Sequence, residues 1–155
     1  MKLELVKIVS GGQTGADRAA LDWAIAHELP HGGWCPRGRK AEDGTIPSRY
    51  RLSETPGAAY VQRTEWNVRD SDGTAVLSLS RTLTGGSSKT VELAQQHGKP
   101  WIHLARNAHA VDAANQLRRF VEEHGIRVLN VAGPRASTEP GIGAFVLTVL
   151  DRAFG

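Results

Sequence analysis

Residues 7–18 read KIVSGGQTGADR, and this stretch decides the fold class of the chain. A short apolar run at residues 3–9 passes into the turn GGQTG at residues 11–15, and a helical pattern begins directly after it. A strand, a glycine turn and a helix N-terminus in this order present backbone N–H groups to a phosphate or another oxyanion. The turn lacks both the complete dinucleotide-binding spacing and the pattern G-x-x-x-x-G-K-[ST]. The sequence therefore predicts neither a standard nicotinamide site nor a P-loop.

The rest of the chain alternates between strand patterns and helix patterns. We expect strands at residues 3–9, 31–35, 74–79, 100–104 and 126–131, and helices at residues 17–27, 58–69, 90–97, 110–124 and 142–154. This alternation predicts one α/β domain over residues 1–155, with a doubly wound parallel sheet and helices on both faces. The polar segment at residues 36–56 is expected to be a long loop that serves as a lid or binding loop.

Composition excludes several classes of protein. The chain has 155 residues and a net charge of +3, which suits an anionic small-molecule ligand better than a nucleic acid. No apolar run approaches the roughly 20 residues that cross a bilayer, and no signal peptide is recognisable, so we expect a cytoplasmic protein without membrane association. Cys35 is the only cysteine, which excludes an internal disulfide, and we expect it to be buried and inert. The histidines are scattered and predict no metal site: His27, His31, His97, His103, His109 and His124.

A second glycine turn, LTGGSSKT at residues 83–90, follows the strand predicted at residues 74–79. Two such turns at the carboxyl edge of one sheet could hold an anion from two sides, so we expect them to lie side by side. The alternative is that the glycines serve only packing. The candidate ligand-binding residues of the two turns are Gly11, Gly12, Gln13, Thr14, Gly15, Arg18, Thr84, Gly85, Gly86, Ser87, Ser88, Lys89 and Thr90.

Basic residues elsewhere are candidates for binding the same anion. Arg37, Arg39 and Lys40 form the densest basic cluster, which is either a phosphate clamp or a solvated loop of mixed charge. Arg135 follows the last predicted strand in a glycine-proline turn. We expect Arg135 to be the strongest single contact.

Two predicted helices carry polar residues that could face the ligand. Arg63, Asn67 and Asp70 fall on one face of the helix at residues 58–69, which is either a solvent face or a polar stripe that faces a cleft. Asn67 is therefore a further candidate binding residue. Glu92 is expected in the first turn of the helix at residues 90–97. It could pair there with a basic group, or it could be present simply because an acidic side chain stabilises the first turn of a helix.

Six ordered segments resemble the molybdenum cofactor carrier proteins. They are SGGQTGADRAALD, HGGWCPRGRKAEDG, IPSRYRLSETP, QRTEWNVRDSDGT, LTGGSSKTVELA and LNVAGPR, and they cover nearly the whole chain. That family lies in the SLOG group, which shares a Rossmann-like fold with the cytokinin-activating phosphoribohydrolases (the LOG, or lysine-decarboxylase-like, proteins). The resemblance implies a carrier that holds the molybdenum cofactor (molybdopterin) as cargo without catalysis. It also implies a homo-oligomer, either a dimer or a tetramer.

The enzymes of the SLOG group suggest a second function. They carry P-G-G-x-G-T-x-x-E, and the corresponding stretch here is TGGSSKTVE, in which the two glycines and Glu92 match. Arg63 falls where the catalytic arginine would be, but threonine replaces the lysine that follows it. Ser88 and Lys89 replace the Gly-Thr pair, and Lys89 could occupy the carboxylate of Glu92. We therefore expect no catalysis. If the chain is an enzyme, it is a phosphoribohydrolase that acts on nucleoside monophosphates through Arg63 and Glu92. A third reading is a nucleotide-binding sensor.

Overall fold

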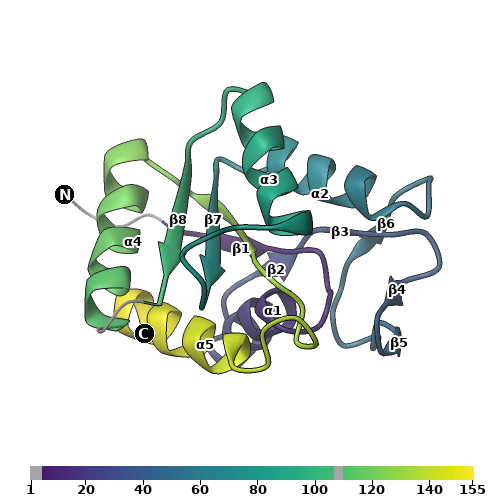
Figure 1. Cartoon of the computed structure of the whole chain (residues 1–155), viewed down its shortest axis with the longest axis horizontal. Coiled ribbons are helices and arrows are strands. Elements are labelled where there is room, and N and C mark those ends of the chain that lie inside the picture. Colours follow the sequence, from purple (N-terminus) through teal and green to yellow (C-terminus); the bar gives the residue numbers. More distant parts are fainter. Residues whose placement is uncertain (1–4, 107–109) are drawn as a thin grey trace.

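The computed structural model describes residues 5–106 and 110–155, and a five-stranded parallel sheet forms its central layer (Figure 1). In spatial order the strands are β2 (His31–Gly32), β1 (Lys7–Val9), β9 (Val128–Ala132), β7 (Gly73–Ser78) and β8 (Trp101–Ala105). All neighbouring pairs in this sheet run parallel. His109 and the beginning of the strand predicted at residues 3–9 fall outside the described residues.

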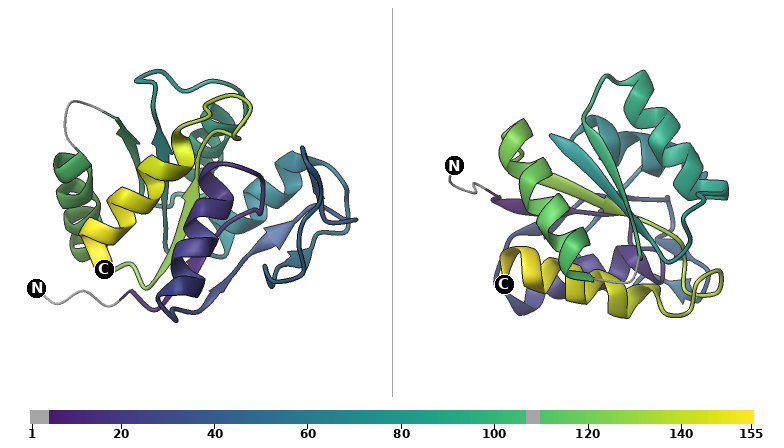
Figure 2. Two further views of the ribbon diagram at one scale, coloured as in Figure 1. Left: turned by 90° about the horizontal axis from the view of Figure 1, so that it is seen from below. Right: turned by 60° about the vertical axis from the view of Figure 1, so that its left-hand side comes forward.

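Helices cover both faces of the sheet, as predicted (Figures 1 and 2). The helices are α1 (Ala16–Ala26), α2 (Tyr60–Arg69), α3 (Gly85–Gln96), α4 (Ala110–His124) and α5 (Ile142–Phe154). On one face, α5 packs between α1 and α4, and on the other face α2 packs against α3. The fold is therefore the Rossmann-like α/β arrangement. Among the described residues, no helix combines the length and apolar character that crossing a membrane requires.

The order of the strands is unusual, because the last strand of the chain lies in the middle of the sheet. If counting starts at β9, the order β2-β1-β9-β7-β8 becomes 3-2-1-4-5, which is the order of a doubly wound dinucleotide-binding sheet. The first strand that the structure describes, β1, is therefore the second strand in this order. The order reverses between β9 and β7, and ligands of such sheets bind at this switch point, outside the carboxyl ends of the strands.

The strand predicted at residues 31–35 is divided in two. β2 pairs with β1, whereas β3 (Trp34–Cys35) leaves the main sheet and pairs with β6 (Ser53–Glu54). Gly33 lies between them with a φ of +127°, and a Cβ there would lie 2.3 Å from the carbonyl oxygen of Ser10. Only glycine fits this close approach, so the chain turns away at this point.

The segment at residues 36–56 is more ordered than the predicted loop. It contains a hairpin of β4 (Lys40–Ala41) and β5 (Gly44–Thr45), followed by β6. Ile46 and Tyr50 are buried in a small core with Leu21 of α1 and Cys35. The segment therefore packs against the first helix as a folded unit. Cys35 is fully buried, and burial raises the pKa of its thiol.

Candidate functional site

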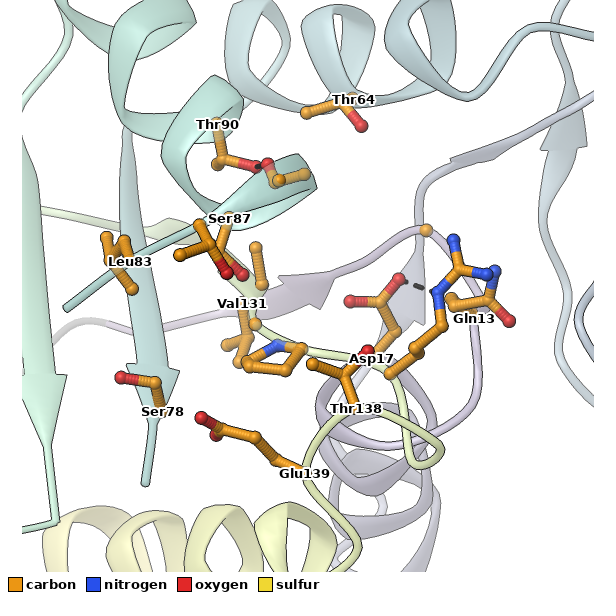
Figure 3. A pocket seen from close by; sticks show the side chains of 18 of the residues that line it. Gln13, Asp17, Thr64, Ser78, Leu83, Ser87, Thr90, Val131, Thr138 and Glu139 are labelled. Atoms are coloured by element: carbon orange, nitrogen blue, oxygen red, sulfur yellow. Dashed lines mark hydrogen bonds between the residues drawn. The ribbon is translucent and has the colours of Figure 1, made fainter. Parts of the chain in front are cut away.

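A cavity of about 290 Å³ opens at the carboxyl edge of the sheet, beside the switch point between β9 and β7 (Figure 3). Its walls come from the segments that follow three strands, together with one side of α2. Both glycine turns contribute, the first through Gly11 and Gln13 and the second through residues 84–87 and Thr90. The structure thus brings the two turns to one cavity, in the arrangement predicted from the sequence.

Most of the first turn packs against protein rather than lining the cavity. Gly15 has a φ of +82°, and a Cβ there would lie 2.6 Å from the carbonyl oxygen of Pro134. The N–H of Ala16 donates to the same oxygen, at 3.2 Å. Gly12 lies against Ile46. Gly12 and Gly15 therefore allow close packing of the start of α1 against its neighbours. Thr14 and Arg18 also lie outside the lining of the cavity.

Gln13 lines the cavity and is 5% exposed. Its Oε1 accepts hydrogen bonds from the N–H groups of Thr14, at 3.0 Å, and of Glu42, at 2.9 Å. Its Nε2 is buried and has no hydrogen-bond partner within the described part of the chain. A buried donor without an acceptor costs about 1–3 kcal/mol. The sequence marked Gln13 as one member of a turn but gave no sign of this unpaired donor.

Asp17 and Arg63 form a buried pair beside Gln13. Arg63 Nη1 lies 3.8 Å from Asp17 Oδ2 and donates to the carbonyl oxygen of Gly11 at 2.8 Å. Asp17 Oδ2 also accepts from the N–H of Gln13, at 3.1 Å. Burial raises the pKa of the Asp17 carboxyl, and the positive charge of Arg63 opposes this rise. Asp17 was not among the predicted site residues, although its place in the first turn of a helix that follows glycine could have marked it.

The second turn is the first turn of α3, which begins at Gly85 instead of residue 90 as predicted. Glycine and serine are poor helix formers, but the helix buries Ser87 and Thr90 together with Leu93, and this packing outweighs their propensity. The space beside Gly85 and Gly86 is open, because a Cβ at either position would meet nothing within 4 Å.

The N-terminus of α3 faces the cavity through residues 84–87. Thr84 precedes the helix in an extended conformation, and its side chain makes no capping hydrogen bond. The positive end of the helix dipole is therefore presented to the cavity without a side-chain cap.

Ser88, Lys89 and Glu92 lie outside the cavity lining. Lys89 Nζ is 3.3 Å from Glu92 Oε1, so the predicted pair forms. Because α3 begins early, Glu92 lies about two turns into the helix, and its predicted place in the first turn was wrong.

Two of the three residues on the polar face of α2 point inward, whereas Asp70 is exposed. Arg63 and Asn67 are buried and line the cavity. The amide of Asn67 accepts from the N–H of Trp34 at 2.7 Å and donates to the carbonyl oxygen of Trp34 at 2.9 Å. Asn67 therefore binds β3 as a neighbouring strand would. Asp70 lies at the end of the helix and accepts from the indole N–H of Trp34 at 2.8 Å.

Of the predicted basic residues, Arg135 lines the cavity, whereas Arg37, Arg39 and Lys40 do not. Arg135 is partly exposed, and its guanidinium lies 5.6 Å from the centre of the Tyr60 ring. The guanidinium of Arg39 donates to four carbonyl oxygens of the segment that follows it: those of Ile46, Pro47, Tyr50 and Leu52.

Acidic residues of the β4–β5 hairpin, not the basic ones, contact the loops around the cavity. Glu42 accepts from the hydroxyl groups of Thr14 and Ser137 and from the N–H of Ser137 at 3.2 Å. Hydrogen bonds from Ser137 and Thr14 lower the pKa of the Glu42 carboxyl. Asp43 pairs with Arg18 of α1. The hairpin is thus attached to both the first turn and the β9–α5 loop.

The wall holds equal numbers of basic and acidic side chains, Arg63 and Arg135 against Asp17 and Glu139. Glu139 accepts from the N–H groups of Leu79, at 2.7 Å, and Ser80, at 3.2 Å. Any attraction for an anion must therefore come from Arg135 and the N-terminus of α3 rather than from an excess of cations. Within residues 5–106 and 110–155, no group of three or more His, Cys, Asp or Glu residues could hold a metal ion.

Comparisons with known proteins give one family and one solved structure. Residues 8–154 match the circularly permutated YpsA SLOG family. The crystal structure of the putative molybdenum carrier protein from Syntrophus aciditrophicus SB is similar, with 46% sequence identity and a TM-score of 0.97. The match covers 100% of this chain and 98% of that protein. No curated protein matches the chain. A strand order that becomes 3-2-1-4-5 when counted from β9 is the arrangement that a circular permutation produces.

Proposed function

Because this chain belongs to the circularly permutated YpsA SLOG family, we propose that the cavity at its switch point binds a phosphorylated small molecule. The observation that carries this proposal is the convergence of Arg135, the first turn of α3 and the first glycine turn on one cavity. A helix N-terminus and an arginine are both suited to a phosphate group. The volume of about 290 Å³ is close to the lower end of small-molecule sites, roughly 300–1,000 Å³.

The cargo that we propose is the molybdenum cofactor, held through its pterin phosphate and without catalysis. Support comes from the similar protein that is named a molybdenum carrier, which this chain matches over its whole length. A carrier requires hydrogen-bond donors and positive charge at the anion but no positioned acid and base. The cavity offers the former through Arg135 and the amides of α3.

Analysis of retained ligand tests this proposal. The protein would be purified from cells that make the molybdenum cofactor and, as the matched control, from cells that cannot make it. We expect molybdenum by elemental analysis and a pterin phosphate by mass spectrometry in the first preparation only. Absence of both from the first preparation, or equal amounts in the two, would contradict the proposal.

One observation favours a second candidate, the phosphoribohydrolase, since Arg63, which the sequence resemblance matches to that enzyme's arginine, lines the cavity. Against it, Glu92 lies outside the lining, and its carboxylate interacts with Lys89 and Gln96. A catalytic carboxylate misplaced by about 1 Å can cost on the order of a hundredfold in rate. We therefore expect no nucleotide cleavage.

An assay of base release from adenosine monophosphate separates the two candidates. Wild type, Arg63→Ala and Glu92→Gln would be compared at equal concentration. We expect no release of adenine from any of the three proteins. Robust release by wild type that both substitutions abolish would establish the enzyme in place of the carrier.

A further inference from the structure

Gln13 has a donor that the described protein leaves unpaired at the wall of the cavity. Gln13 is only 5% exposed, and its Nε2 has no hydrogen-bond partner among the described residues. Its orientation is determined, because Oε1 already accepts from two backbone N–H groups, those of Thr14 and Glu42. A flip of the amide would break both of these hydrogen bonds. Nε2 is therefore the end that lacks an acceptor.

Asp17 places a carboxylate next to this donor. Its side chain is 11% exposed, it lines the cavity, and Oδ2 accepts one hydrogen bond from the N–H of Gln13. A carboxylate can accept about four hydrogen bonds, so capacity remains for a donor from a ligand. Arg63 Nη1, 3.8 Å from Asp17 Oδ2, also donates to the carbonyl oxygen of Gly11, so its charge is already engaged by protein groups at this end of the cavity.

The two ends of the cavity thus differ in chemistry. Gln13 and Asp17 lie on one side, whereas Ser87, in the first turn of α3, lies on the other (Figure 3). An oxyanion suits the α3 end, where the helix N-terminus is open. Because Arg63 and Asp17 are paired at the Gln13 end, this end suits a group that has an acceptor and an N–H donor side by side.

We propose that Gln13 and Asp17 determine specificity by recognising an acceptor–donor edge on the heterocycle of a phosphorylated ligand. Such an edge is present in the fused pyrimidine ring of a pterin and of a purine. The acceptor of the ring receives a hydrogen bond from Gln13 Nε2, and the adjacent ring N–H or amino group donates to Asp17. This inference rests on the proposed function, because it assigns the second half of the same site. It excludes a bare oxyanion, such as molybdate or phosphate, as the preferred ligand.

Three probes test the inference in calorimetric titrations: ribose 5-phosphate, guanosine monophosphate and 6-hydroxymethylpterin phosphate. The first two share the ribose phosphate, and in the second a heterocycle replaces the C1 hydroxyl group. We expect wild type to bind at least one heterocyclic phosphate about tenfold or more tightly than ribose 5-phosphate, as a hydrogen bond to a charged group would give. Whichever of the two heterocyclic phosphates binds more tightly shows whether the recognised edge belongs to a pterin or a purine.

The variant Gln13→Met removes the donor without adding a charge to the cavity wall. We expect it to lose the preference for the heterocyclic phosphate and to bind ribose 5-phosphate as wild type does. Gln116→Met makes the same change on the exposed face of α4 and serves as the matched control. If Gln13→Met does not fold, as judged by its melting curve, Gln13→Leu replaces it and the expected result is the same.

Two results would overturn this inference alone: equal affinity of wild type for all three probes, or an equal loss for ribose 5-phosphate and the heterocyclic phosphates in the Gln13 variant. Failure of wild type to bind any of the three probes would overturn the proposed function as well. The two failures are therefore distinguishable.

Discussion

At the scale of single residues, several polar side chains that suggested ligand binding make hydrogen bonds that complete the fold. Arg39 satisfies four carbonyl oxygens of the segment behind it, and Asn67 pairs with the backbone of Trp34. Neither role is visible in the sequence, because both depend on contacts between residues distant along the chain or on the local path of a loop. A residue type and its neighbours indicate that a side chain is polar and near the site, but not which group it binds.

Arg39 provides a test of this structural role. We expect Arg39→Met to lower the free energy of unfolding by about 2–3 kcal/mol, because several partly buried carbonyl oxygens lose their donors. Arg37→Met, two residues earlier and exposed, is the matched control, and its stability should stay close to that of wild type. Urea denaturation measures both. Equal stability of the two variants would show that the hydrogen bonds of Arg39 contribute little.

His103 makes stability dependent on pH. Its Nε2 lies 2.6 Å from Ser78 Oγ, and burial lowers the pKa of the imidazole, with a smaller opposing effect from the charge of Glu139. The unfolded chain, in which the pKa of histidine is about 6.5, therefore binds a proton more readily than the folded chain. The free energy of unfolding is therefore highest above about pH 6.5, and it falls as the pH drops below this value.

Unfolding at pH 7.5 and pH 5.5 measures this effect. We expect wild type to be less stable at pH 5.5, and His103→Gln to show a smaller loss than wild type between the two pH values. His124→Gln, at an exposed position, should lose as much as wild type. A loss in His103→Gln equal to that of wild type would assign the pH dependence to other groups, such as His31, whose pKa is also lowered by burial.

At the scale of elements, the periodic helices were predicted well and the glycine segments poorly. The predicted bounds of α4 and α5 agree with the structure, because apolar residues repeat at helical spacing through both of them. The start of α3 was placed five residues late, since Gly-Gly-Ser-Ser has a low helix propensity that burial outweighs. The division of β2 from β3 was missed, because the positive φ of Gly33 has no signature in composition.

Two glycines, one from each glycine turn, should respond oppositely to substitution. Gly86→Ala should raise stability by about 0.5–1 kcal/mol, because alanine favours a helix and its Cβ would enter open space. Gly15→Ala should lower stability by more than about 1–2 kcal/mol, since its positive φ and its contact with Pro134 exclude a side chain. Thermal melting measures both variants. The same sign of change in the two would contradict the packing described for these turns.

At the scale of the whole molecule, the parallel sheet was predictable, but the order of its strands was not. Alternating patterns predict strands and crossovers, whereas strand neighbours depend on pairings between distant segments. β9 pairs with β1 and β7, so the last strand of the chain is central and its following loop brings Arg135 to the first glycine turn. The meeting of the two glycine turns could be predicted because both follow parallel strands at one edge.

The central claim is that this cavity binds the molybdenum cofactor through Arg135 and the N-terminus of α3. Its most direct test is the dissociation constant for cofactor freed from a molybdoenzyme, measured for wild type, Arg135→Ala and the exposed control Arg119→Ala. We predict that Arg135→Ala binds about tenfold or more weakly than wild type, as loss of a hydrogen bond to a charged group implies, and that Arg119→Ala binds as wild type does. Equal affinity of all three folded proteins, or no binding by wild type, would contradict the claim.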